Sequence, residues 1–190
     1  MDIILASASP RRQALLEMLG VNFRVIPSES EEVLTPGLTP EQTVCKVAFG
    51  KVSQLRTEHD ILEDALIIAA DTLVYLDGRP LGKPDSPEDA VDMLCALSGR
   101  RHTVYTGVAI ARGDTHVTGA EATDVYFREL SEGEITRYVE TGEPLDKAGS
   151  YGAQGRGSVF IERIEGDFFN VMGLPLCRLS VMLRNFGIML

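Results

Sequence analysis

The segment Ser7-Ala8-Ser9-Pro10-Arg11-Arg12 combines hydroxyl and guanidinium groups within six residues. It follows a short apolar run, and its proline favours a helix that begins there. A helix N-terminus presents backbone N–H groups and partial positive charge, and arginine binds phosphate through two parallel hydrogen bonds. The segment therefore predicts an anion site; the alternative is an N-cap serine followed by two solvated arginines.

A carboxylate stands at the end of the longest apolar run in the chain. Asp71 follows residues 65–70, which predict a buried strand, so we expect its side chain at the carboxyl edge of a sheet, where α/β proteins bind ligands. There it could bind a divalent metal or accept a proton from water, or it could be a turn aspartate. Glu31 and Glu32 lie in an acidic loop, for which a solvated run of charge is the plainer interpretation.

Two further segments could bind phosphate or a base. Lys83 lies in a glycine-containing stretch that is not a Walker A loop, because Pro84 stands where a hydroxyl residue should hold magnesium. It can still reach a phosphate, or it is a turn lysine. Lys147 and Gln154 lie in residues 144–157, which are rich in glycine and predict a loop shaped by positive φ angles. Gln154 offers a donor and an acceptor suited to a base edge.

Other catalytic patterns are missing from the sequence. No metal or triad spacing joins the histidines His59, His102 and His116, which we expect on the surface or in strands. The cysteines Cys45, Cys95 and Cys177 match neither a disulfide framework nor a metal site, and we expect reduced core thiols. Histidine and serine catalysis are therefore poorly supported.

The charge balance limits the partners of the chain. Its 190 residues include 18 Lys and Arg against 28 Asp and Glu, a net charge of −10, and no tryptophan. This argues against nucleic acid and membrane surfaces as partners, so an anion site would have to be a local cationic pocket. No apolar run approaches the roughly 18 to 20 residues that span a bilayer, and no export signal is recognisable. We expect a cytoplasmic protein.

The elements that position these residues are predicted from hydrophobic periodicity and from start and stop signals. Helices are expected after Ser9, after Thr39, after Ser86, over 131–139 and over 175–185. Strands are expected over 3–6, 21–26, 66–70 with a continuation over 73–76, and in a long hairpin over 103–128. Residues 159–164 and 168–172 are expected to form a second hairpin.

This order predicts the α/β (mixed α+β) class: a single domain over residues 1–190, with a twisted mixed sheet flanked by helices and two lobes around a central cleft. The helix after Thr39 would carry Lys51. Gly50 lies inside that helix, where glycine costs about 1 kcal/mol relative to alanine.

Together these segments resemble the Maf family of nucleoside triphosphate pyrophosphatases. The resemblance runs through LASASPRRQALLEMLG (5–20), Glu31-Glu32, Lys51, AADT (69–72), GKP (82–84), LSG (97–99), PLDKAGSYGAQG (144–155) and VMGLPL (171–176). It implies hydrolysis of a nucleoside triphosphate to the monophosphate and pyrophosphate, with a divalent metal cation, Mg or Mn. It also implies a Maf/ITPase-like fold and a homodimer.

The resemblance assigns roles to single residues. Asp71 matches the family's proton acceptor, and Glu32 and Asp71 match acidic positions of its metal and phosphate site. The polar and basic cleft positions are matched by Ser7, Arg11, Arg12, Lys51, Lys83 and Lys147.

Three positions distinguish two branches of the family. Arg11, Thr72 and Gln154 give SPRR, ADT and YGxQG, as in the branch that prefers dTTP and UTP, whereas the 7-methyl-GTP branch carries SPWR, SDQ and a glutamate. The resemblance thus implies a dTTP/UTP pyrophosphatase with loose discrimination among pyrimidines, since one methyl group is worth only about 1 to 3 kcal/mol. The alternatives are a 7-methyl-GTP pyrophosphatase and a nucleotide-binding regulator of cell division or septum formation.

Overall fold

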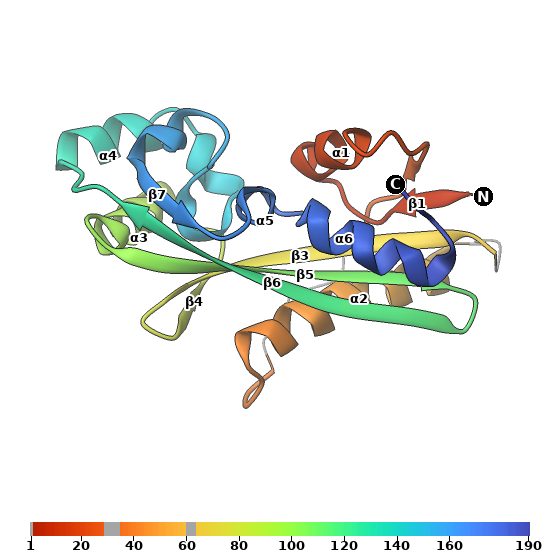
Figure 1. Ribbon diagram of the computed structural model, residues 1–190. Helices are drawn as coiled ribbons and strands as arrows, with labels where there is room; N and C mark the ends of the chain where they lie inside the picture. The colour runs from red at the N-terminus through yellow and green to blue at the C-terminus, as the bar shows by residue number, and fades with distance from the viewer. Residues whose placement is uncertain (1, 29–34, 60–63) are drawn as a thin grey trace. The chain divides into compact units, whose positions relative to one another are not determined.

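A computed structural model describes residues 2–28, 35–59 and 64–190 (Figure 1). The strands are β1 (Ile3–Leu5), β2 (Arg24–Val25), β3 (Leu66–Leu76), β4 (Arg79–Leu81), β5 (Arg101–Arg112), β6 (Thr115–Phe127) and β7 (Ile161–Glu165). The α-helices are α1 (Pro10–Glu17), α2 (Pro40–Glu58), α3 (Pro87–Leu97), α4 (Glu132–Val139), α5 (Phe168–Met172) and α6 (Leu176–Leu183). Short 3₁₀ helices are η1 (Glu143–Asp146), η2 (Ala148–Ser150), η3 (Arg156–Phe160) and η4 (Arg184–Phe186).

The described strands form one mixed sheet. Its order is β2-β1-β3-β5-β6-β7, with β4 paired to β3. β1 runs parallel to β2 and β3, whereas β4 is antiparallel to β3 and β7 is antiparallel to β6. A two-residue connection at Gly113-Asp114 joins β5 to β6, as the hairpin prediction required. The predicted mixed α/β class is confirmed.

The chain divides into two compact units. Unit 1 contains Met1–Asp71, Thr106–Glu121 and Gly173–Leu190, and unit 2 contains Thr72–Tyr105 and Ala122–Met172. The central cleft and the single-domain description stay predictions.

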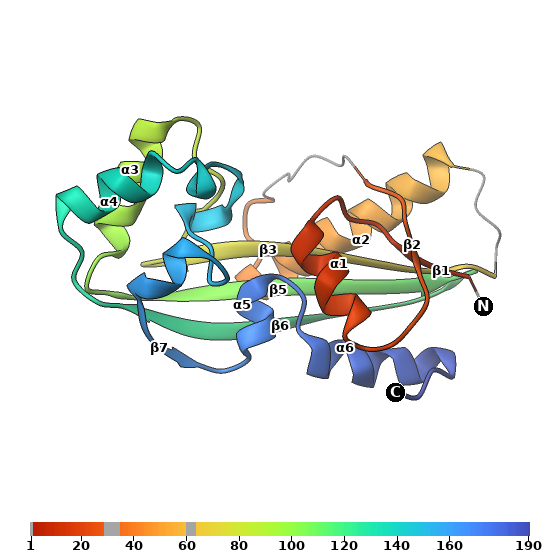
Figure 2. The ribbon, with the colours of Figure 1, turned by 90° about the horizontal axis from the view of Figure 1, so that it is seen from above.

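Helix α2 organises unit 1. Its capping box is formed as predicted: Thr39 Oγ1 accepts a hydrogen bond from the Gln42 amide at 3.3 Å, and Gln42 Oε1 accepts one from the Thr39 amide at 3.0 Å. The helix continues through Gly50, so the predicted position of Lys51 on it is confirmed. Ala48, Val52 and Leu55 of α2 join a buried cluster with alternating residues of β1, β3 and β5. Helices α1 and α6 lie on the opposite face of these strands (Figures 1 and 2).

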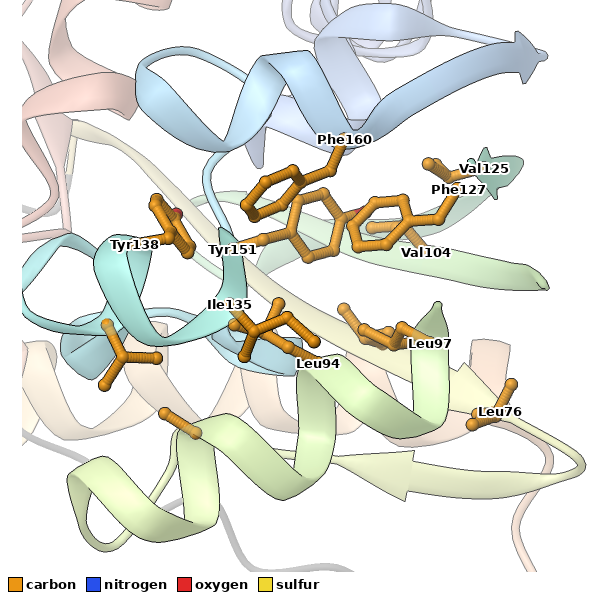
Figure 3. Close-up of a cluster of buried hydrophobic side chains, with 13 residues drawn as sticks. Leu76, Leu94, Leu97, Val104, Val125, Phe127, Ile135, Tyr138, Tyr151 and Phe160 are labelled. Carbon is orange, nitrogen blue, oxygen red and sulfur yellow. The ribbon is translucent and has the colours of Figure 1, made fainter. Parts of the chain in front are cut away.

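Unit 2 has a core that is rich in aromatic rings (Figure 3). The rings of Phe127 and Tyr151 meet edge to face with centroids 4.8 Å apart, and those of Tyr138 and Phe160 do so at 4.9 Å. Leu94 and Leu97 of α3 and Ile135 of α4 belong to the same cluster. The core therefore packs the glycine-rich segment, through Tyr151, against the sheet.

The predicted hairpin over 159–164 and 168–172 is wrong. Only its first arm is a strand, β7, which pairs with β6; the second arm is helix α5. The Oδ1 atom of Asp167 accepts hydrogen bonds from the amides of Phe169 and Asn170 at 2.8 and 3.3 Å. This is how an aspartate starts a helix, and it overrides the strand preference of the aromatic residues that follow.

Three smaller predictions need correction. The strand expected over 21–26 is reduced to β2, whose two residues are exposed. Strand β4 was not predicted, although its Asp77-Gly78 turn was; both turn residues have positive φ, as a tight hairpin requires. The cysteines are free, but Cys95 and Cys177 are exposed rather than in the core.

None of the helices in the described parts of the chain is long and apolar enough to cross a membrane.

Candidate functional site

Strand alternation explains how Asp71 meets Lys51 in unit 1. Ala65, Ile67 and Ala69 join the buried cluster beneath α2, so the next alternate residue of β3, Asp71, has its side chain on the same side. Lys51 lies on the buried stripe of α2, next to Val52. The lysine Nζ donates to Asp71 Oδ1 at 2.6 Å and to the Ala70 carbonyl at 3.4 Å.

This ion pair is withdrawn from solvent. The side chain of Asp71 is 1% exposed and that of Lys51 is 10% exposed. The other carboxylate oxygen, Asp71 Oδ2, is buried with no hydrogen-bond partner among the described residues. A buried carboxylate oxygen without a donor is costly, which makes Asp71 Oδ2 a candidate contact for a ligand.

The expected position of Asp71 at the end of a strand is wrong. Strand β3 continues through Asp71 and Thr72 to Leu76. A buried carboxylate is tolerated inside the strand because Lys51 neutralises it. The neighbouring strand β1 does end, and in the β1–β3 pairing Leu5 lies opposite Ile68, so Asp71 lies beyond the last paired residues of β1.

The predicted anion segment of unit 1 forms the turn from β1 into α1. Ser7 is buried, and its Oγ accepts hydrogen bonds from the Ser9 amide at 3.2 Å and from Arg12 Nη1 at 3.4 Å. Arg12 Nε donates to the Gly173 carbonyl at 2.8 Å. Among the described residues no side chain caps the start of α1, and Arg11 is half-buried in its first turn. The segment thus keeps an uncapped helix start beside two guanidinium groups, which suits an anion.

In unit 2 the structure joins two of the predicted segments. The Gly149 amide donates to the Gly82 carbonyl at 3.0 Å, so the glycine-rich segment is tied to the residue before Lys83. Lys147 Nζ donates to the Glu143 carbonyl at 2.5 Å and to Asp146 Oδ1 at 2.6 Å. Lys83 is exposed, which leaves its long side chain able to reach a phosphate.

The specificity positions Thr72 and Gln154 also lie in unit 2. Thr72 follows Asp71 directly in β3 and is half-buried, while Gln154 is exposed between η2 and η3. The loop predicted over 144–157 is only partly correct: parts of the 3₁₀ helices η1, η2 and η3 occupy most of it, and residues 151–155 around Gln154 are irregular.

Of the two residues expected to hold a metal, Glu32 and Asp71, the structure describes Asp71. Glu31 and Glu32 lie outside the described residues, and within the described part of the chain no three histidine, cysteine or acidic side chains are grouped as metal ligands. Magnesium, however, is usually held by one or two carboxylates together with substrate phosphates and water. The partnerless, buried Oδ2 of Asp71 fits that demand as a hard oxygen donor.

Two features of unit 2 were not predicted from the sequence. His102 is buried on β5, with Nε2 2.8 Å from Tyr151 Oη, and burial lowers its pKa from 6.5 to about 4. Burial also raises the pKa of the Tyr151 hydroxyl, so the pair is neutral. The second feature is Glu143, which binds the backbone of the glycine-rich segment. Neither its residue type nor its spacing from Arg156 and Gly157 signalled these contacts in the sequence.

The comparisons with known proteins cover almost the whole chain. A family model described as "Maf-like protein" matches residues 2–186. A Moorella thermoacetica protein named "dTTP/UTP pyrophosphatase" is 51% identical over 189 residues, which cover 98% of this chain and 95% of the relative. Proteins with the same name from Bacillus cereus (strain AH820) and Caldicellulosiruptor saccharolyticus are 48% and 44% identical, covering 98% and 97% of this chain and 96% and 94% of the relatives.

A solved structure also matches this chain, at a lower sequence identity than these relatives. It is titled "The structure of the Staphylococcus aureus Ham1 protein", with a TM-score of 0.49 and 16% identity, covering 85% of this chain and 80% of the other.

Proposed function

This chain belongs to the Maf family, and from that premise we propose that it hydrolyses dTTP and UTP to the nucleoside monophosphate and pyrophosphate. Relatives at 44 to 51% identity over nearly their full length carry that activity in their names. Arg11, Thr72 and Gln154 support the same substrate branch. The observation that carries the catalytic part is Asp71, held by Lys51 through one oxygen and without a partner among the described residues on the other.

In the proposed reaction, water attacks the α-phosphorus and the bond from that phosphorus to the bridging oxygen breaks, releasing pyrophosphate. Asp71 Oδ2, which has no hydrogen-bond partner among the described residues, accepts the proton of the attacking water as the general base. Lys51 pairs with the carboxylate and fixes its orientation through the 2.6 Å contact.

The phosphates carry several negative charges, so the site needs cations more than it needs a strong nucleophile. We propose Ser7, Arg11 and Arg12 as phosphate-binding residues, because the turn before α1 offers hydroxyl, guanidinium and backbone N–H groups. Lys83 and Lys147 are proposed as further substrate-binding cations.

Asp71 and Glu32 are the residues that would hold a divalent cation, Mg or Mn. When bound, the metal would neutralise phosphate charge and polarise the phosphoryl oxygens. Glu32 enters this proposal from the family resemblance; the partnerless Asp71 Oδ2 can serve either as a metal ligand or as the proton acceptor, but not as both at once.

Substrate choice is proposed to depend on Thr72 and Gln154. The amide of Gln154 can match the donor and acceptor pattern of a pyrimidine edge.

We also propose that the protein is a cytoplasmic homodimer. Sedimentation of the purified protein would test the dimer, and fractionation of cells would test the location.

The decisive experiment measures pyrophosphate release from dTTP, UTP, CTP, GTP, ATP and 7-methyl-GTP with magnesium or manganese. We expect release mainly from dTTP and UTP, and its loss in Asp71→Asn. Release mainly from 7-methyl-GTP would favour the other branch. Binding without release would favour a nucleotide-binding regulator.

A further inference from the structure

Glu143 holds the segment that carries Gln154. Its Oε2 accepts a hydrogen bond from the Arg156 amide at 3.0 Å, and its Oε1 accepts from the Gly157 amide at 3.2 Å and from Tyr138 Oη at 3.0 Å. Tyr138 Oη in turn accepts from the Gly152 amide at 3.1 Å. The backbone is thus fixed two residues before Gln154 and two and three residues after it.

The backbone shape at this point also fits the carboxylate. Gly155 has φ 131° and ψ −154°, a conformation that is essentially restricted to glycine. A Cβ atom at this position would lie 2.9 Å from Glu143 Oε1, so any other residue would push the carboxylate away. The backbone at Gly155, next to Gln154, therefore packs directly against the Glu143 carboxylate.

Glu143 also contacts Lys147, through its backbone. The carbonyl oxygen of Glu143 accepts the 2.5 Å hydrogen bond from Lys147 Nζ. One residue thereby contacts a proposed phosphate-binding lysine through its backbone and the proposed base-reading segment through its side chain. Burial would raise the pKa of the Glu143 carboxyl, but the hydrogen bonds from Arg156, Gly157 and Tyr138 lower it, so the acceptor stays ionised.

The Gln154 side chain is not held by hydrogen bonds of this kind. Its side chain is exposed, and no hydrogen bond of that side chain to another described residue is seen. Its position is set by the backbone on either side, which Glu143 and Tyr138 hold.

We propose that Glu143 is a positioning residue for base recognition: its carboxylate fixes the segment 152–157 so that Gln154 meets the base while Lys147 binds phosphate. This inference rests on the proposed function, because it takes Gln154 as the residue that reads the base. It adds a specificity determinant that does not touch the substrate.

Kinetics of pyrophosphate release from UTP and GTP test the proposal. Glu143→Gln keeps the size of the side chain but replaces one acceptor oxygen with a donor that faces an N–H group. We expect KM for UTP to rise about tenfold, the effect of losing one charge-assisted hydrogen bond, with kcat changed less than about threefold and the preference for UTP over GTP reduced. Glu140→Gln, an exposed glutamate three residues away, is the control and should match the parent.

A double-mutant cycle separates positioning from folding. Gln154→Ala should lower the UTP preference, and adding Glu143→Gln to it should lower that preference no further. An equal loss of activity on both nucleotides in Glu143→Gln, with the UTP preference intact, would overturn the proposal in favour of a structural role. An unchanged preference in Gln154→Ala would overturn the base-reading role while leaving pyrophosphate release in place.

Amide hydrogen exchange provides a readout that does not depend on activity. In Glu143→Gln the amides of Gly152, Arg156 and Gly157 should exchange faster, by about tenfold, and in Glu140→Gln they should not. Unchanged exchange would overturn the proposal even if kinetics altered. Failure of the parent protein to release pyrophosphate from any nucleotide would instead overturn the proposed function and, with it, the recognition role of Glu143.

Discussion

Lys51 and Asp71 form a buried ion pair in which Nζ lies 2.6 Å from Oδ1, while the carboxylate's second oxygen has no partner in the described parts of the chain. The pair joins helix α2 to strand β3 and leaves one oxygen available for chemistry. Asp71 leads to a prediction on turnover, and Lys51 leads to a prediction on stability.

Asp71→Asn should reduce pyrophosphate release from dTTP and UTP by about 10² to 10⁴-fold, the usual contribution of a general base. The amide keeps the size of the side chain but cannot accept the proton of water. Steady-state turnover is the measurement, with Asp77→Asn as control, because Asp77 is exposed and its positive φ of 51° suits asparagine. Near-normal turnover of Asp71→Asn would contradict the assigned role.

Lys51→Met should lower the free energy of unfolding by about 3 to 5 kcal/mol, because it leaves the Asp71 carboxylate buried without its cation. Denaturant unfolding measures this. Lys46→Met on the same helix replaces an exposed lysine whose Nζ donates to Thr35 Oγ1 at 2.7 Å, and it should change stability by less than about 0.5 kcal/mol. Equal effects of the two variants would argue against a stabilising pair.

The buried His102 should make stability depend on pH. Its folded pKa of about 4 lies below the ordinary 6.5, so between these values the unfolded state binds more protons, and stability falls as pH falls through this window. The full contribution, about 3 kcal/mol, is present above pH 6.5 and is lost towards pH 4.

Unfolding curves at several pH values check this prediction. His102→Gln should flatten the pH dependence between 6.5 and 4, whereas His59→Gln, at an exposed position, should leave it as in the parent. The same slope in all three proteins would show that His102 does not titrate differently on folding.

Gly107→Ala should destabilise unit 1 by about 1 to 3 kcal/mol or more. A Cβ there would lie 2.3 Å from the carbonyl atoms of Val44, so α2 would have to move away from β5. Gly50→Ala is the matched comparison: nothing lies within 4 Å of its Cβ, and alanine in a helix should stabilise by about 0.5 to 1 kcal/mol. Thermal unfolding should therefore shift in opposite directions, and a shared direction would refute the packing argument.

The helix that carries Lys51 and the strand that carries Asp71 could be predicted from the sequence, but not every contact of these residues could. The pattern of α2 and the apolar run before Asp71 placed both charged residues correctly on their elements. Their contact follows from alternation along β3, which places Asp71 on the side that α2 covers. What failed was the end of the strand, because a carboxylate normally stops a buried strand unless a cation lies opposite it.

The role of Glu143 could not be read from residue type or spacing. Its carboxylate contacts residues 13 and 14 positions further along, and those contacts depend on the positive φ of Gly155. Helix α5 was missed for a similar reason, since a single aspartate side chain decides whether Phe168-Phe169 starts a helix or extends a strand. Short-range patterns are weakest where one side-chain-to-backbone bond selects the local conformation.

The division of the chain into units has a consequence for how the protein is made. Unit 2 is complete once Met172 has been added, whereas unit 1 also needs Gly173–Leu190. That last segment supplies Leu179, Leu183 and Phe186, all buried, and the Gly173 carbonyl that binds Arg12. During synthesis the turn that carries Ser7 and Arg12 therefore leaves the ribosome long before Gly173, whose carbonyl binds Arg12 and which lies 161 residues further along the chain.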